Sequence, residues 1–294
     1  MPITNHPIPQ ITLNTAAEIP QLGYGTLAVQ PDRESTAGNA AITAEIVSQA
    51  LDAGYRHVDT AQAYGTEQGV GRAIAASGIP RDEIYVTSKL ANANHGPDDV
   101  KRSFEQTLEN LGLEQLDLFL IHWPLPTLYD GDYVSTWKAV SGFVADGRLR
   151  SAGVSNFRPA HLERIIAETG IVPAVNQFEI HPYFNNDAPR ETCQRHGIAV
   201  EAHSPLGHNS APLSDATVAA IAAAHDKTAA QVILRWHMQH GIIAIPKSAR
   251  PERMAENLDI FDFALTDDEL AAIDKLDRGP DGRVGPNPDT YEGV

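Results

Sequence analysis

The segment LDLFLIH, at residues 116–122, is a nearly unbroken apolar run that ends in a histidine. Two strand-like runs precede it, YRHVD at 55–59 and IYVTSK at 84–89, and they end in an aspartate and a lysine. Apolar runs of this length are typical of parallel strands that are buried on both faces. If the three strands are neighbours in one sheet, their polar end groups lie together at one edge.

Five further strand-like runs continue this pattern, and segments with helical spacing separate them. The strands are predicted at 22–25, 56–59, 84–89, 116–122, 151–155, 174–177, 199–203 and 242–246. The helices are predicted at 41–53, 67–76, 98–111, 133–146, 159–169, 187–196 and 215–225. Eight strands that alternate with helices predict a closed α/β architecture, the (β/α)8 TIM barrel. An open doubly wound sheet is the alternative, but no glycine-rich phosphate turn follows the first strand.

Residues 11–20, which precede the first strand, contain two short apolar runs around Asn14 and Thr15. They predict a β-hairpin that closes the floor of the barrel. No linker, charge block or low-complexity stretch divides the sequence, so we expect a single barrel domain over residues 1–294. Met1–Asn5 does not resemble a secretion signal, and no apolar run is long enough to span a bilayer. We therefore expect a cytoplasmic protein with no membrane partner.

The chain is acidic, with 38 acidic residues, 22 basic residues and a formal net charge of −16. This balance argues against nucleic acid as a partner, and it requires a local cluster of cations for any anionic ligand. The stretch KSARPER at 247–253 is such a cluster, and Pro251 suits the first turn of a helix, where a phosphate binds well. The single cysteine, Cys193, excludes an internal disulfide and a cysteine-based zinc site, and we expect no metal.

Seven motifs, in this order and spacing, resemble those of the aldo-keto reductases, and most closely those of the bacterial 2,5-diketo-D-gluconate reductases. They are LGYGT at 22–26, GYRHVDTA at 54–61, IHWP at 121–124, GVSNF at 153–157, NQ at 176–177 with Glu179 following, SPLG at 204–207 and IPKS at 245–248. The resemblance covers about residues 11–288. It implies an NADPH-dependent reductase of aldehydes and ketones with a catalytic tetrad of Asp59, Tyr64, Lys89 and His122.

The chemistry of these four residues supports that function. Active sites of TIM barrels form at the carboxyl ends of the strands, where Asp59, Lys89 and His122 are predicted to lie. Hydride that reaches a carbonyl carbon leaves negative charge on oxygen, which must meet a proton or an oriented donor. A free tyrosine has a pKa of about 10, and a lysine within about 4 Å is expected to lower it. We predict that Tyr64 donates the proton, that Asp59 keeps Lys89 charged, and that neutral His122 orients the carbonyl.

The resemblance also assigns residues to the two ends of the NADPH cofactor. The nicotinamide end comprises Ser155, Asn156, Gln177, His203, Ser204 and Leu206, and the end with the 2′-phosphate and adenine comprises Lys247, Ser248, Arg250, Arg253, Glu256 and Asn257. Amide side chains both donate and accept hydrogen bonds, as a carboxamide partner requires.

Two positions depart from the family pattern. The family usually has tyrosine or tryptophan at the position of His203, whose smaller ring is expected to stack over less area and to bind the cofactor less firmly. The diketogluconate reductases have an aromatic residue at the position of Ala91, so we expect a wider mouth here, and this argues against a direct transfer of their sugar-acid substrate. The candidate substrates are keto-sugars, glyoxals and aromatic aldehydes. The substrate side is predicted to comprise Tyr24, Leu27, Ala91, Trp123 and the C-terminal loop from Gly279, which lies over the active site.

Two other functions are weighed against the reductase. One is a catalytically weak NADPH-binding protein of the same fold, and the intact tetrad argues against it. The other is an aldolase that forms a Schiff base on Lys89. Asp59 and the cluster of cations at 247–253 argue against this hypothesis. The expected partner is a small-molecule carbonyl substrate, and a monomer is the expectation that the family gives.

Overall fold

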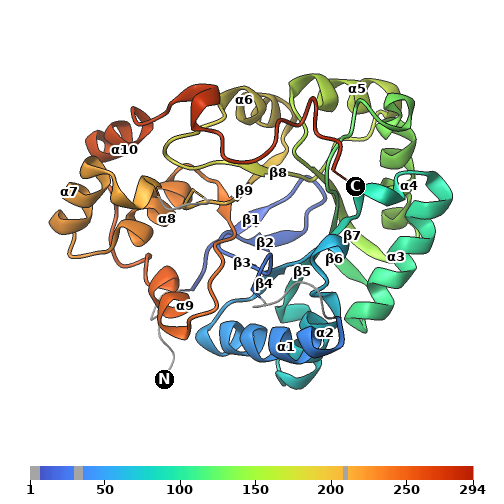
Figure 1. The fold of residues 1–294 in the computed structure, drawn as a ribbon, viewed down its shortest axis with the longest axis horizontal. Coiled ribbons are helices and arrows are strands. Elements are labelled where there is room, and N and C mark those ends of the chain that lie inside the picture. The colour runs from blue at the N-terminus through green and yellow to red at the C-terminus, as the bar shows by residue number, and fades with distance from the viewer. Residues whose placement is uncertain (1–6, 30–35, 208–210, 294) are drawn as a thin grey trace.

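The computed structural model describes residues 7–29, 36–207 and 211–293, so the expectation about Met1–Asn5 lies outside the described residues. Eight parallel strands curl around one axis, and helices surround them (Figure 1). The strands are β3 (Tyr24–Gly25), β4 (His57–Asp59), β5 (Tyr85–Leu90), β6 (Leu116–Ile121), β7 (Leu149–Ser155), β8 (Val175–Glu179), β9 (Ala199–His203) and β10 (Ile243–Ala244). All eight match the predicted strands to within two residues at each end.

The sheet closes between its first and last strands. The strands pair in chain order from β3 to β10, each parallel to the next. Across the remaining seam, the backbone N–H of Gly23 donates to the carbonyl of Ala244 at 2.9 Å, and the N–H of Ala244 donates to the carbonyl of Gln21 at 2.9 Å. The predicted (β/α)8 barrel is therefore confirmed, and the open sheet is excluded.

Helices cover the outside of the barrel. They are α1 (Thr36–Ala53), α2 (Glu67–Ala76), α3 (Pro97–Leu111), α4 (Tyr133–Ala145), α5 (Pro159–Thr169), α6 (Asp187–His196), α7 (Ala216–Ala224), α8 (Ala229–Gln239), α9 (Pro251–Leu258) and α10 (Asp267–Asp274). The prediction omitted α8 and α10. Both begin with a capping box, formed by Thr228 with Gln231 and by Thr266 with Glu269, and this sequence signal could have identified them.

The predicted hairpin closes the barrel floor. Strands β1 (Gln10–Thr12) and β2 (Glu18–Pro20) pair antiparallel. Ile19 is fully buried in a cluster with Leu118 and other side chains of the barrel strands. The Asn14 amide in the turn donates to the carbonyl of Pro173 at 3.0 Å. Because side chains pack this end, the carboxyl ends of the strands remain as the end that can receive ligands.

The C-terminal segment crosses this open end, as predicted. After α10 the chain passes over the region of β8 and β9 and ends beside α4 (Figure 1). The Glu179 carboxylate, at the end of β8, accepts from the backbone N–H groups of Val284 at 2.6 Å and Gly285 at 2.8 Å. Further along, the ring of Tyr291 lies 4.3 Å from that of Trp123. These contacts fix the C-terminal loop over the strand ends.

Among the helices of the described ranges, none combines the length and the apolar character that crossing a bilayer requires.

Candidate active site

The four predicted catalytic residues come together at the carboxyl ends of β4, β5 and β6. Asp59 ends β4, Tyr64 ends the short 3-10 helix that follows, and His122 comes directly after β6. Lys89 lies between them, and its Nζ donates to Asp59 Oδ1 at 2.5 Å and to the Tyr64 hydroxyl at 3.3 Å. A third donor of the same ammonium is bonded to the carbonyl of Thr60 at 3.1 Å. All three N–H groups of the Lys89 ammonium thus have hydrogen-bond acceptors.

The Lys89 side chain remains charged although it is fully buried. Burial alone lowers the pKa of a lysine, but the carboxylate of Asp59 and the nearby Tyr64 hydroxyl outweigh it and raise the pKa of Lys89 above its ordinary value. A buried ion pair of this kind is costly to break, because either partner alone is an uncompensated charge. The pair therefore provides a fixed cation next to the phenol.

The Tyr64 hydroxyl differs from the expectation in one respect. Burial raises the pKa of Tyr64 above its ordinary value, and Lys89 opposes this rise without reversing it. Lys89 thus acts on the Tyr64 pKa in the predicted direction, but the net pKa stays above that of a free tyrosine, because the prediction did not include the loss of solvent. The phenol consequently keeps its proton at neutral pH, and Lys89 favours the phenolate that remains after the proton has left.

The His122 ring lies next to this phenol, with ring centroids 5.6 Å apart. Its enclosed surroundings, and then the charges of Lys89 and His203, lower the pKa of His122 well below its ordinary value. The imidazole is therefore neutral at physiological pH and can donate one hydrogen bond to a carbonyl oxygen. This state agrees with the neutral form that the sequence predicted.

The buried side-chain amide of Gln177 connects the carboxyl groups of Asp59 and Glu201. The Gln177 amide donates one hydrogen bond to Asp59 Oδ2 at 2.9 Å and another to Glu201 Oε1 at 3.0 Å. Burial, and then the charge of Asp59, raises the pKa of Glu201 to about 8. Glu201 was not among the residues predicted from the sequence. The signal was available, because an acidic residue in the middle of a barrel strand and two positions before His203 faces the same side as that residue.

Four of the residues predicted for the nicotinamide end form one hydrogen-bonded group, namely Ser155, Asn156, His203 and Ser204. The Asn156 amide donates to the carbonyl of His122 at 3.0 Å and to the hydroxyl of Ser155 at 3.1 Å, while its oxygen is 3.0 Å from His203 Nε2. Because an amide oxygen can only accept, Nε2 of His203 carries the proton. His203 Nδ1 lies 3.3 Å from the hydroxyl of Ser204. Leu206 is partly buried and packs on the main hydrophobic core.

The residues predicted for the phosphate end lie in the turn before α9 and in its first residues. Lys247, Arg250 and Arg253 are exposed, and within the described residues none of them forms an ion pair with a carboxylate. The buried Ser248 hydroxyl accepts from the backbone N–H of Arg250 at 3.1 Å and so shapes the turn. Three unpaired cations at a helix start on an acidic chain form a site suited to a phosphate.

Two further residues were predicted at the adenine. Asn257 is buried in the last turn of α9, and Glu256 is partly exposed and accepts a hydrogen bond from the Thr228 hydroxyl at 2.7 Å. Their role stays a prediction.

The residues predicted for the substrate side occupy different environments. Leu27 is exposed, and Ala91 is partly exposed while its backbone N–H donates to the Gln62 side chain at 2.7 Å. Trp123 contacts Tyr291, a residue of the C-terminal loop that the prediction did not name. Tyr24 is buried, and its hydroxyl donates to the carbonyl of Ser248.

The hydrogen bond to Ser248 places Tyr24 beside the turn that carries Lys247 and Arg250. A substrate role for it stays a prediction.

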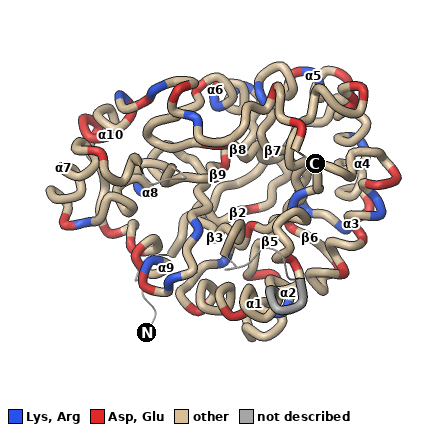
Figure 2. Tube along the Cα trace, viewed as in Figure 1, with Lys and Arg blue, Asp and Glu red and all other residues tan. Residues whose placement is uncertain are grey.

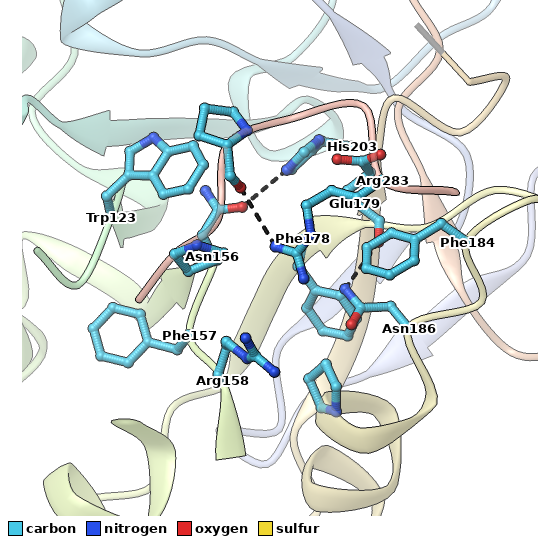
Figure 3. A pocket seen from close by; sticks show the side chains of 13 residues that line it. Trp123, Asn156, Phe157, Arg158, Phe178, Glu179, Phe184, Asn186, His203 and Arg283 are labelled. Carbon is cyan, nitrogen blue, oxygen red and sulfur yellow. Dashed lines mark hydrogen bonds between the residues drawn. The ribbon is translucent and has the colours of Figure 1, made fainter. Parts of the chain in front are cut away.

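A cleft opens beside the residues predicted for the nicotinamide end, under the C-terminal loop (Figure 3). It encloses about 410 Å³, part of which is open to solvent. Trp123, Asn156 and His203 line one part, and Glu179 and Arg283 line another. The cleft borders the tetrad rather than enclosing it, since Asn156 is bonded to the carbonyl of His122. A ligand in it would thus lie beside the predicted nicotinamide residues.

Comparisons with known proteins agree with this geometry. The model of the Aldo/keto reductase family matches residues 21–278. An aldo-keto reductase of Mycobacterium sp. (strain KMS) is 47% identical over 283 residues, which are 96% of this chain and 98% of that protein. The morphine 6-dehydrogenase of Pseudomonas putida is 42% identical over 292 residues, covering 95% of this chain and 94% of that protein. The crystal structure of a Gox0644 mutant in complex with NADPH is 43% identical, with a TM-score of 0.90 and coverage of 98% of this chain and all of that one.

Proposed function

The chain belongs to the aldo/keto reductase family and is an NADP-dependent oxidoreductase, and we propose that it reduces aldehydes and ketones to alcohols with Tyr64 as the proton donor. The observation that carries the proposal is the position of Lys89 Nζ, which bonds both Asp59 and the Tyr64 hydroxyl at the carboxyl end of the barrel. NADPH oxidation in the presence of glyoxals, aromatic aldehydes and keto-sugars tests it directly. No oxidation with any of these classes would contradict it.

The chain's own residues supply the acid chemistry. NADPH, when bound, provides the hydride that reduces the carbonyl carbon. Tyr64 gives its proton to the carbonyl oxygen, and Lys89 stabilises the phenolate that remains. The neutral His122 donates a hydrogen bond to the same oxygen and so fixes the direction of the carbonyl. Asp59 keeps Lys89 charged and in place throughout.

The hydrogen bonds already formed by the predicted nicotinamide-binding residues determine which of their atoms can still bind a carboxamide. Both N–H groups of Gln177 are already used by Asp59 and Glu201, so only its carbonyl oxygen is left, as an acceptor. The amide of Asn156 is likewise bonded to neighbouring groups. We infer that Gln177 accepts from the carboxamide N–H, and that the Ser155 hydroxyl is the group that can donate to its oxygen.

The exposed cations in the turn before α9 and in its first residues fit the 2′-phosphate of NADPH. Figure 2 shows basic residues at α9, and the chain as a whole is acidic, with a formal net charge of −16. A group that binds only the 2′-phosphate distinguishes NADPH from NADH, because the two cofactors differ only there.

Arg253→Ala is therefore expected to weaken NADPH binding by about tenfold or somewhat more and to leave NADH binding nearly unchanged. A charge-assisted contact contributes about 1.5–3 kcal/mol. Titration of both cofactors by fluorescence quenching measures this, and the NADPH preference should shrink as salt rises. Lys275→Ala, at an exposed position after α10, is the matched control. Equal losses for both cofactors would show that Arg253 is structural.

The mouth of the site suits bulky carbonyl compounds. Ala91 presents only a methyl group at the strand end that leads into the 3-10 helix at Asn92–Asn94. The similarity to morphine 6-dehydrogenase, an enzyme named for a large polycyclic compound, supports a wide entrance. We infer that aromatic aldehydes and dicarbonyl compounds are accepted along with small aldehydes.

Ala91→Trp is expected to raise KM for bulky substrates by about tenfold or more and to change KM for the smallest aldehydes little, because an indole narrows the entrance. Steady-state kinetics with a graded series of aldehydes measures the difference. Ala91→Val, which adds two methyl groups, should give an intermediate effect. A uniform increase across the series would show that residue 91 does not border the substrate path.

The two alternative functions fit the structure less well. The Lys89 ammonium is buried and has three hydrogen-bond acceptors, whereas a Schiff base needs a neutral, accessible amine. Trapping with borohydride in the presence of a ketone would label Lys89 only if the aldolase function were correct. Quenching by NADPH without turnover would favour the weak binding protein.

We also infer a single-domain monomer in the cytoplasm, which sedimentation and cell fractionation test.

A further inference from the structure

Glu201, in the middle of β9, is a carboxyl group inside the barrel to which the proposed mechanism gives no task. The residue is fully buried, and its Oε1 accepts from Gln177 Nε2 at 3.0 Å. Its other oxygen, Oε2, has no hydrogen-bond partner among the described residues. A buried ionised carboxylate needs several donors, and this group has one. The geometry therefore favours the neutral acid.

The position of Glu201 connects it to the catalytic pair. Strand β9 lies across the barrel from β5, which carries Lys89 (Figure 1). The Gln177 amide spans the gap, with one N–H on Glu201 Oε1 and the other on Asp59 Oδ2. The second oxygen of Asp59 holds Lys89. Glu201 thus fixes the amide, the amide fixes Asp59, and Asp59 fixes the lysine beside Tyr64.

The charges in this interior also require a neutral Glu201. The titratable groups that face it are His57 and Asp59 of β4, Tyr64 of the 3-10 helix at Gln62–Tyr64, and Tyr85 and Lys89 of β5. Gln177 of β8 and Ile243 of β10 are uncharged neighbours. Burial lowers the pKa of His57 to about 3 and raises that of Tyr85, so both are neutral. One cation then faces two carboxyl groups, and Asp59 is the partner that contacts it.

We propose that Glu201 is a positioning residue for the Asp59–Lys89 pair, that it acts in its protonated form through Gln177, and that loss of its proton weakens Tyr64 as an acid. This inference rests on the proposed reductase function. An ionised Glu201 adds a negative charge that favours the neutral phenol and disfavours the phenolate. Its charge also raises the pKa of Lys89 further. Carbonyl reduction must then decline as Glu201 loses its proton.

The pH profile of kcat/KM for carbonyl reduction tests this role. The wild type is expected to fall on the order of tenfold around pH 8, the effect of one extra charge across a protein interior, well before Tyr64 itself loses its proton. Glu201→Gln keeps an acceptor for the Gln177 amide but cannot ionise, so this decline should disappear from its profile. Glu67→Gln is the matched control, since Glu67 is a buried glutamate of α2 whose pKa burial also raises. Its profile should keep the decline.

Infrared spectroscopy of the protein alone, labelled with ¹³C-glutamate, gives a readout that does not depend on activity. The wild type should show the C=O band of a protonated glutamate that disappears with a midpoint near pH 8. That band should persist in Glu67→Gln and be absent in Glu201→Gln. A wild type without reductase activity would overturn the proposed function, while the infrared titration would still decide the state of Glu201. A wild type without a titrating band, or a Glu201→Gln profile that keeps the decline near pH 8, would overturn this inference.

Discussion

Replacement of Tyr64 by phenylalanine is expected to lower kcat for carbonyl reduction by about 10²- to 10⁴-fold, the usual contribution of a general acid. The reason is the geometry around the hydroxyl, which is the group of Tyr64 that contacts Lys89 at 3.3 Å. Because the ring remains, its contact with His122 and the shape of the mouth should be retained. Single-turnover kinetics with saturating NADPH measures the chemical step separately from cofactor binding.

Two control experiments test whether the loss of activity in Tyr64→Phe is specific to proton donation. NADPH should still quench the tryptophan fluorescence of Tyr64→Phe with an affinity close to that of the wild type, because none of the cofactor contacts inferred above involves the hydroxyl. Tyr129→Phe is the control, since the Tyr129 hydroxyl donates to the carbonyl of Asn92 outside the tetrad. If Tyr64→Phe reduced aldehydes at close to the wild-type rate, the proton would have to come from another donor, and the assignment of Tyr64 would be wrong.

The sequence predicted the tetrad because the fold brings strand ends together. Asp59, Lys89 and His122 each stand at the end of an apolar run, and parallel strands place such ends at one edge. The direction of the pKa shift at Tyr64 could not be predicted in the same way. It depends on how much solvent the surrounding side chains exclude, and the spacing of Lys89 along the chain gives no information on that quantity.

Hydrogen bonds between residues that are far apart in the chain could not be predicted from the sequence either. Gln177 was predicted to bind the carboxamide, but its bonds to Asp59 and Glu201 arise only when β4, β8 and β9 close into a ring. Likewise, the hydrogen bond between His203 and Asn156 is not visible in two motifs that lie 47 residues apart. His203 therefore has a defined polar role, and its Nε2 proton is directed at Asn156 before any cofactor stacks on the ring.

Removal of Lys89 is expected to have the largest effect on stability. In Lys89→Met the carboxyl of Asp59 stays buried without its cation, and loss of one partner of a buried pair typically costs about 3–5 kcal/mol. Burial already raises the pKa of Asp59, and without Lys89 nothing but the Gln177 hydrogen bond opposes it. The folded variant therefore binds a proton at Asp59 that the unfolded chain, with an ordinary pKa of about 3.9, releases at neutral pH.

The sign of the pH dependence follows from this difference in bound protons. Above about pH 4 the folded variant holds one proton more than the unfolded chain, so its stability falls by about 1.4 kcal/mol for each pH unit. The deficit relative to wild type should consequently be smaller at pH 5 than at pH 7 in urea unfolding followed by circular dichroism. Asp59→Asn combined with Lys89→Met removes both charges and should recover most of the loss at pH 7. A deficit that is equal at both pH values, and that the double variant does not relieve, would mean that Lys89 contributes through packing and that its pairing with Asp59 adds nothing to stability.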